Sequence, residues 1–351
     1  MSEVVIRTAA SPETVSPVDT DRQLTAAARQ AVADGIPDST RRAYSADMTA
    51  FTAWCASVGR RPLPATAETL TEYVAHLSLT PSPRTGRPLA PATIERVLAA
   101  IRTTHKAADL PTPETKGARK VLSGYRQRLA VTKARAALPR KAAPATPDAL
   151  GEMLAALDRD TLIGKRDAVL LLLGYACAAR VSELAALDQA DAVETEDGLL
   201  VSVYRRKLKR HDEVAVPYGS NPATCPVRAV RALLAALAAE GRTAGPLFVR
   251  VDRHGRVAPT MNRHGKAIGD ASGRITPTAA SAVVTRAALL AGFEGQWTGH
   301  SLRRGFATAA RRAGHTVERI GRHGGWADGS RALLGYMEEG DRWERNPVAG
   351  L

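Results

Sequence analysis

Several residues in the last third of the sequence are of types that bind an anion. His300 and Arg303 stand three residues apart, so they share one face if this segment begins a helix. The start of a helix also presents free backbone N–H groups to an anion. The pair therefore fits a phosphate ligand. A histidine beside an arginine is nevertheless common by chance, and the pair alone is a weak signal.

Arg180 is a second candidate, because it stands between two apolar stretches. Residues 169–178 read as a buried helix, and Leu184 and Leu187 belong to the next one. A buried arginine is unfavourable unless it is paired or binds an anion. One interpretation is that Arg180 forms a structural ion pair with Glu183, and the other is that it binds an anion. Both can hold at once, with Glu183 orienting the guanidinium. Tyr336, taken alone, is typical of a helix core or interface.

The charge of the chain points to a polyanionic partner. The 351 residues include 49 Lys+Arg and 35 Asp+Glu, a formal net charge of +14. Nucleic acid is the first expectation and a membrane surface the second. Residues 116–141 hold nine Lys or Arg and no acid, and residues 205–210 hold five in a predicted hairpin turn. Both segments favour contact with a nucleic-acid backbone.

Other classes of site are absent from the sequence. It has no glycine-rich nucleotide loop, no HExxH, no CxxC and no GxSxG, and its three cysteines lie far apart. The apolar run 168–179 is shorter than the roughly 20 residues that span a bilayer, and the N-terminus lacks a secretory core. We therefore expect a soluble cytoplasmic protein with no metal site and no membrane association.

The elements that must position these residues are mostly helical. In the first third we predict helices from Asp38 through Cys55, over 67–79, from Pro91, and after Pro113 to near Leu129. In the remainder we predict helices over 147–157, 165–179, 225–240, 276–291, 301–313, 316–321 and about 330–339. Strands are predicted over 198–204 and 213–217, and residues 251–275 are predicted to form a loop or small hairpin.

These elements predict a mainly α fold in two domains. An all-α N-terminal domain is followed by a mostly helical domain with a small antiparallel β-sheet. The predicted boundaries are a flexible tail over 1–20, a first domain over 21–135, a linker over 136–147 and a second domain over 148–351.

Taken in order, the motifs resemble the tyrosine recombinase (phage integrase) family of DNA breaking and rejoining enzymes. The resemblance covers roughly residues 20–340 and includes the all-α first domain, which resembles the family's core-binding domain. The ordered set is far more specific than any one member. It consists of Ala179-Arg180-Val181-Ser182-Glu183-Leu184, a lysine in a hairpin, Gly299-His300-Ser301-Leu302-Arg303-Arg304-Gly305-Phe306-Ala307-Thr308, Gly325-Trp326 and, ten residues later, Tyr336.

The resemblance implies a role for each matching residue. Arg180 and Arg303 would hold the scissile phosphate, supported by His300, and Tyr336 would be the nucleophile. The remaining implied site residues are Glu183 in support of the first arginine, Trp326 as an N–H donor to phosphate, and Lys207 as general acid. Lys209 stays open as the alternative general acid, because the hairpin is short. The step from Trp326 to Tyr336 is slightly longer than in many members.

The resemblance also implies a reaction and partners. Attack by tyrosine would give a 3′-phosphotyrosyl intermediate without ATP, metal or other cofactor, on double-stranded DNA held by a tetramer. A type IB topoisomerase and a non-enzymatic DNA-binding protein on the same fold are the alternatives. The expected DNA contacts are Arg119, Lys120, Arg126, Arg128, Arg205, Arg206, Lys209 and Arg210.

Overall fold

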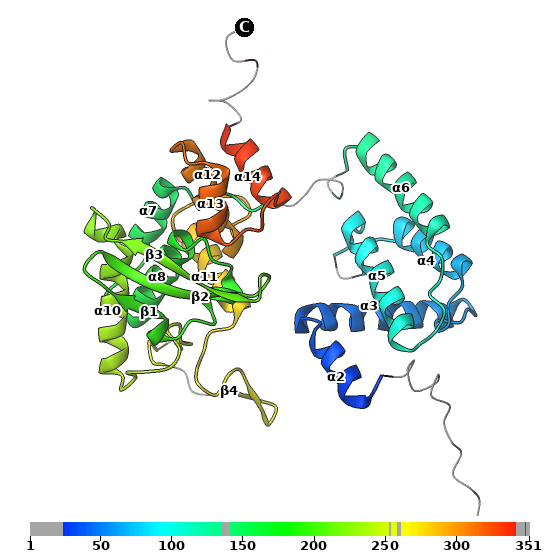
Figure 1. Ribbon diagram of the computed structural model, residues 1–351, viewed down its shortest axis with the longest axis horizontal. Helices are drawn as coiled ribbons and strands as arrows, with labels where there is room; N and C mark the ends of the chain where they lie inside the picture. Colours follow the sequence, from blue (N-terminus) through cyan, green and yellow to red (C-terminus); the bar gives the residue numbers. More distant parts are fainter. Residues whose placement is uncertain are drawn as a thin grey trace, which may run out of the picture. The chain divides into compact units, whose positions relative to one another are not determined.

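The computed structural model describes residues 24–83, 85–134, 136, 141–252, 254–257, 261–341 and 348. The chain forms two compact units, residues 1–139 and 140–351 (Figure 1). The predicted tail over 1–20 lies outside the described residues. Residues 141–146, which the sequence suggested as linker, pack onto the second unit, because the Ala143 and Ala145 N–H groups donate to Gln296 and Ser301 carbonyls at 2.8 and 2.9 Å.

The first unit is all helical in its described part. Its helices are α2 (Ala26–Asp34), α3 (Asp38–Ser57), α4 (Ala67–Leu79), α5 (Pro91–Ala107) and α6 (Lys116–Val131). The Thr66 hydroxyl caps α4 by accepting from the Thr69 N–H, and Pro91 opens α5. The pairs α3–α5 and α4–α6 pack together around a core that includes Phe51, Leu70, Ile94, Ile101 and Leu122.

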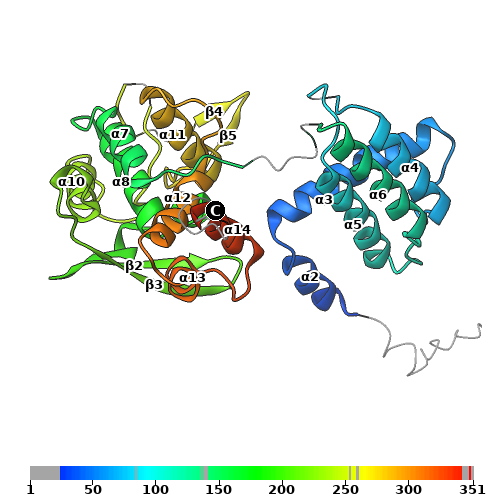
Figure 2. The same ribbon diagram turned by 90° about the horizontal axis from the view of Figure 1, so that it is seen from above.

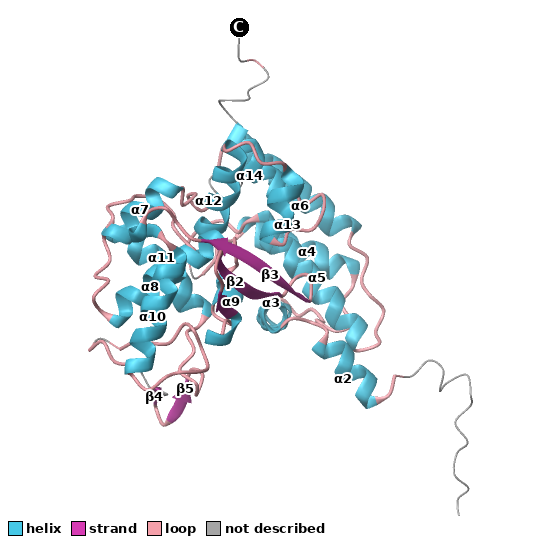
Figure 3. Cartoon of the chain, turned by 60° about the vertical axis from the view of Figure 1, so that its left-hand side comes forward, coloured by secondary structure: helices cyan, strands magenta, loops and turns pink. Residues whose placement is uncertain are grey.

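The second unit places a small sheet among helices, as the secondary-structure colouring shows (Figure 3). Its central helix, α8 (Leu162–Ala176), packs against α10 (Pro226–Ala239) and α12 (Gly299–Arg312). The remaining helices are α7 (Pro147–Ala155), α9 (Val181–Leu184), α11 (Pro277–Leu290), α13 (Val317–Gly324), α14 (Arg331–Asp341) and the 3₁₀ turns η2 (Gln189–Asp191) and η3 (Pro222–Thr224).

The main sheet is antiparallel in the order β1-β2-β3. Its strands are β1 (Ala192–Glu194), β2 (Gly198–Arg205) and β3 (Arg210–Pro217), and β4 (Met261–Arg263) pairs with β5 (Lys266–Ile268) in a separate hairpin. The predicted mainly α fold with a small antiparallel sheet is confirmed. Strand β1 escaped prediction, because three residues are too short for a periodic signal. Strands β2 and β3 continue to the Arg205–Arg210 pair, so only residues 206–209 form the turn.

The three cysteines, Cys55, Cys177 and Cys225, are all free and buried, and burial raises the pKa of the Cys177 thiol to about 12. Among the described residues, no helix is both long and apolar enough to cross a membrane.

Gly305 in α12 is a close-packing position. A side chain there would overlap the backbone of Ala145, whose N–H donates to the Ser301 carbonyl of the same helix. We expect Gly305→Ala to lower the free energy of unfolding by about 1–3 kcal/mol through overpacking. Gly151→Ala, in α7 where nothing lies within 4 Å, should instead be neutral or stabilising by up to about 1 kcal/mol. Urea unfolding measures both, and equal effects would contradict the packing argument.

Candidate active site

Arg180 is fixed at the turn between α8 and α9. The chain leaves α8 through Ala178, whose φ of 46° is left-handed, and Arg180 then caps α9. The Glu183 carboxylate accepts from the Arg180 backbone N–H at 2.9 Å and from its Nη1 at 2.6 Å. The Glu183 side chain is 0% exposed and that of Arg180 is 20% exposed. The buried carboxylate therefore orients a guanidinium that still reaches the surface.

Arg303 lies almost fully buried on α12. Its Nη1 donates to the carbonyl oxygens of Ala178 and Gly324, and its guanidinium carbon lies 3.5 Å from the centre of the Trp326 ring. Its Nη2 is buried without a hydrogen-bond partner among the described atoms. Burial, with the nearby charge of Arg180, lowers the pKa of Arg303 to about 9, so it stays protonated at neutral pH. A buried cation with a free donor favours an anionic ligand.

His300 stands in the first turn of α12. The Thr298 hydroxyl caps this helix and accepts from the His300 N–H at 3.2 Å. Burial first, and then the charges of Arg303, Arg180 and Lys207, lower the pKa of the His300 imidazole below its usual 6.5. The imidazole is therefore neutral at pH 7. The three cations come from separate parts of the second unit, namely α12 for Arg303, the residue before α9 for Arg180 and the β2–β3 turn for Lys207.

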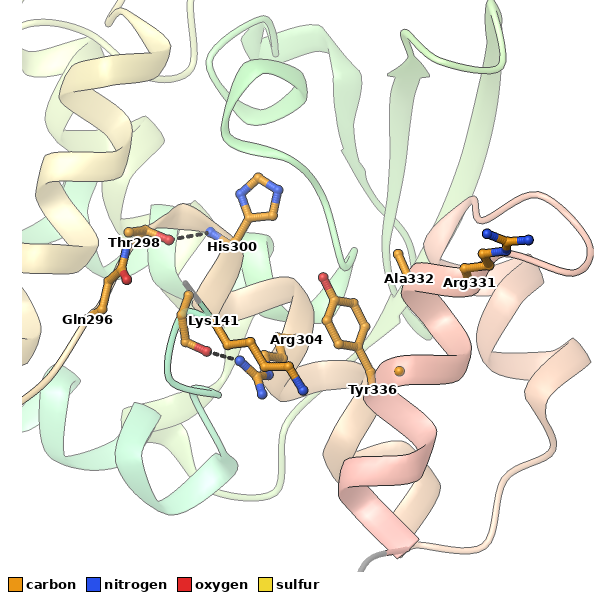
Figure 4. Close-up of a pocket in the computed structure, with 10 residues that line it drawn as sticks. Lys141, Gln296, Thr298, His300, Arg304, Arg331, Ala332 and Tyr336 are labelled. Atoms are coloured by element: carbon orange, nitrogen blue, oxygen red, sulfur yellow. Dashed lines mark hydrogen bonds between the residues drawn. The ribbon is translucent and has the colours of Figure 1, made fainter. Parts of the chain in front are cut away.

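Tyr336 faces this group from α14. Its ring packs edge-on against Trp326, with 6.3 Å between ring centres, and is half-buried. Tyr336 and His300 line a cavity of about 520 Å³, in which the Tyr336 hydroxyl is directed toward the end of α12 that carries His300 (Figure 4). The structure thus gathers the hydroxyl, the imidazole and the predicted arginines in one region.

The cavity also has basic lining residues that the sequence reasoning did not single out as site residues. Lys141 closes the acid-free basic segment, and Arg331 stands five residues before Tyr336 at the start of α14. Arg304 donates through Nη1 to the Ala142 carbonyl and lies over the Tyr336 ring. The excess of basic residues in 116–141 was the available signal for Lys141.

Lys207 lies in the turn of the β2–β3 hairpin. Strand β2 ends at Arg205, one residue beyond its predicted end, and Lys207 is the second residue of the four-residue turn and is exposed. Lys209 lies in the same turn with a left-handed φ of 53°. Lys207 is the turn residue whose charge contributes to the lowered pKa of His300.

Arg205 was predicted to contact DNA, and this prediction is wrong. Its side chain is 0% exposed, since β2 directs it into the second unit. Nη1 donates to the Glu183 carboxylate at 3.2 Å, and Nη2 donates to the carbonyls of Cys177 and His323, each at 3.1 Å. A side chain enclosed in this way cannot reach a DNA backbone.

The other predicted DNA contacts are exposed. Arg119, Lys120, Arg126 and Arg128 lie on α6 of the first unit, and Arg206, Lys209 and Arg210 lie on the hairpin of the second. Two of them already have acidic partners, since Arg126 binds Glu95 at 2.6 Å and Arg210 binds Asp212 at 2.7 Å. Ion pairs at the protein surface contribute little to folding stability, so these arginines can exchange their carboxylate partners for DNA phosphates.

The chain is similar to known integrases and recombinases. The phage integrase family model matches residues 145–340. The integrase/recombinase XerD homolog of Selenomonas ruminantium is 27% identical over 344 residues, covering 94% of this chain and 90% of the relative. A lambda integrase fragment (75–356), solved as a dimer on a COC' core site, matches with a TM-score of 0.54, 15% identity and coverage of 88% and 92%.

A second solved structure shows the same fold. XerH recombinase on a palindromic difH substrate, in a post-cleavage complex, matches with a TM-score of 0.50 and 15% identity, covering 84% of this chain and 76% of that one. The family model alone covers more than half of the chain, and the matched residues include Arg180, His300, Arg303 and Tyr336. The chain therefore belongs to the phage integrase family, the tyrosine recombinases.

Proposed function

We propose that this site-specific recombinase cuts DNA through attack of the Tyr336 hydroxyl on a backbone phosphodiester. The bond from phosphorus to the 5′ oxygen breaks, leaving a 3′-phosphotyrosyl enzyme and a 5′-hydroxyl. The observation that carries the proposal is a continuous set of contacts. Arg303 stacks on Trp326, Trp326 packs against Tyr336, and Tyr336 lines one cavity with His300. Arg303 also donates to the Ala178 carbonyl, two residues before Arg180. A 5′-hydroxyl from another strand can attack the phosphotyrosyl ester and reverse the step, because the ester retains the energy of the phosphodiester bond that was broken.

The two arginines neutralise the phosphate as negative charge builds up. Arg303 has a buried Nη2 without a partner among the described atoms, and Arg180 is oriented by Glu183. Donors fixed in advance stabilise a developing charge without reorganising during the reaction. Trp326 supports the planar Arg303 guanidinium by stacking on it. In this assignment Trp326 donates its indole N–H to a phosphate oxygen.

Proton transfer is divided between two groups. The neutral His300 imidazole accepts a proton as the Tyr336 hydroxyl attacks, which an imidazolium could not do. Lys207 delivers a proton to the departing 5′ oxygen, and Lys209 is the alternative donor. No ATP and no metal takes part, because each step exchanges one phosphoester for another.

The first unit and the hairpin supply the grip on double-stranded DNA. Exposed basic side chains on α6, Arg119, Lys120, Arg126 and Arg128, contact the backbone together with Arg206, Lys209 and Arg210. We assign residues 21–135 to core-site binding and residues 148–351 to catalysis, with assembly into a synaptic tetramer on DNA in the cytoplasm.

The test is the capture of a covalent protein–DNA complex, and it uses randomised DNA because the target sequence is not known. Nicked duplexes with randomised centres are incubated with the protein, and complexes that survive denaturation are isolated and sequenced. We expect a recurring sequence and a nucleotide attached to the peptide that contains Tyr336. Capture on another residue would refute the nucleophile, and no capture would refute the strand-cutting proposal. Relaxation of a plasmid without the captured sequence would favour a topoisomerase.

The pH dependence of cleavage tests the role of His300. Because its pKa is lowered, cleavage should slow on acidification along a limb whose midpoint lies below the ordinary histidine pKa of 6.5, where the imidazole becomes protonated. His300→Gln should lose this acidic limb and slow cleavage by about 10²-fold. Single-turnover rates from pH 5 to 8 measure both. An acidic limb that persists unchanged in the variant would assign it to another group.

A further inference from the structure

Arg205 is a buried arginine whose partners come from four separate segments. Besides Glu183 on α9, it reaches the Cys177 carbonyl after α8 and the His323 carbonyl in the last turn of α13. Its Nε lies 3.5 Å from the Asp212 carboxylate on β3. Figure 2 shows α13 beside the β2–β3 hairpin, in agreement with the bond from Arg205 on β2 to the His323 carbonyl on α13.

Arg205 and Arg303 hold the same two segments at successive residues. Arg205 bridges the carbonyls of Cys177 and His323, and Arg303 bridges those of the next residues, Ala178 and Gly324. The following residue, Gly325, has a left-handed φ of 62°, and a Cβ there would lie 2.7 Å from the Arg205 Nε. The Arg205 side chain therefore occupies space that a larger residue at position 325 would need.

The contacts of Arg205 continue as a chain of alternating charges. Arg180 pairs with Glu183, Glu183 with Arg205, Arg205 with Asp212, and Asp212 with Arg210. Arg205 and Arg210 are directly opposed in the sheet register, and the turn that carries Lys207 lies between them. One end of the chain is thus the phosphate-binding arginine, and the other end is the base of the lysine hairpin.

The geometry points to Arg205 as a positioning residue that holds the Lys207 turn in register with Arg180. This inference rests on the proposed function, in which Arg180 holds the phosphate and Lys207 protonates the leaving oxygen. A fully buried guanidinium keeps its partners rigid, because breaking any one contact leaves a buried charge or carbonyl unpaired. Arg205 itself does not reach the DNA.

The test compares two leaving groups. Replacing the bridging 5′ oxygen with sulfur gives a thiolate, which leaves without a proton because the pKa of a thiol is about 8.5. A displaced Lys207 should therefore slow the oxygen substrate far more than the sulfur substrate. Both are made as nicked duplexes of the sequence that the wild-type protein captures. Lys207→Ala is the reference variant for a lost proton donor.

We expect Arg205→Met to slow cleavage of the oxygen substrate by about 10²-fold and to raise the sulfur-to-oxygen rate ratio by about tenfold, as Lys207→Ala does. Arg166→Met is the matched control. Arg166 is also buried in the second unit, at 5% side-chain exposure, and bonds Asp167 and the Val249 carbonyl. This control should lose thermal stability while keeping the wild-type ratio.

A wild-type ratio in folded Arg205→Met would overturn the inference. If Arg205→Met does not fold, Asp212→Asn decides, since Asp212 is 17% exposed and joins Arg205 to Arg210 without lying at the centre of the network. A raised ratio in Asp212→Asn supports the inference, and an unchanged ratio overturns it. Failure of the wild-type protein to capture DNA would instead refute the proposed function.

Discussion

Replacing Tyr336 with phenylalanine is expected to abolish the covalent DNA complex, with a loss in cleavage rate of more than about 10⁴-fold. The substitution removes one oxygen atom, which is the atom that attacks phosphorus in the proposed reaction. The ring keeps its edge-on packing against Trp326 and its position under Arg304. Within the described residues the Tyr336 hydroxyl makes no hydrogen bond, so its loss should leave folding intact.

Denaturing gels with end-labelled nicked DNA measure this effect, and thermal unfolding and gel-shift assays check fold and affinity. Tyr204→Phe is the control, because Tyr204 lies exposed on β2 and should give the wild-type yield of adduct. Retention of the adduct by Tyr336→Phe would show that another residue is the nucleophile. Loss of DNA affinity in the same variant would mean that the hydroxyl serves binding and not attack.

Replacing Arg303 with lysine is expected to slow strand cleavage by about 10³-fold although the positive charge is retained. The guanidinium uses Nη1 for the Ala178 and Gly324 carbonyls and keeps Nη2 for a further acceptor. A lysine ammonium is a point charge without this planar fork, and it cannot stack on Trp326 in the same way. It would satisfy the carbonyls or the phosphate, but not both.

Single-turnover cleavage measures the loss, and Arg312→Lys is the control. Arg312 is the last residue of the same helix and is exposed, so its replacement should leave the rate within about threefold of wild type. A similar rate for Arg303→Lys and the wild-type protein would show that charge alone, without the fork, satisfies the site. In that case the unpartnered Nη2 would have no catalytic meaning.

Local signals in the sequence were sufficient to predict most of the helices. Helix α4 was predicted with its observed bounds, Ala67–Leu79, and the structure shows that the Thr66 hydroxyl caps its start. The cluster of Arg180, His300, Arg303 and Tyr336 could be predicted only from the order of the motifs. These residues come together through packing of α8, α12 and α14, and no spacing within a single element reveals such contacts.

Arg205 was misassigned because its charge was weighed more heavily than its place in the strand. Leu199, Val201 and Val203 are buried and alternate with residues that are less buried, and Arg205 continues this period of two. The alternation therefore contained the signal for burial. What it could not supply was the set of partners, which come from α9, α13 and the ends of α8 and β3. A run of basic residues indicates solvent-exposed side chains only where the fold provides no buried partners for them.

The burial of all three cysteines has a practical consequence for spectroscopy. Because Cys55, Cys177 and Cys225 are enclosed, thiol-reactive dyes should leave the native chain unlabelled. Cysteines introduced at exposed positions, Gln127 on α6 and Ala232 on α10, would then be the preferred attachment points. Energy transfer between a donor and an acceptor at these positions would report the separation of the two units on DNA, without first removing any native thiol.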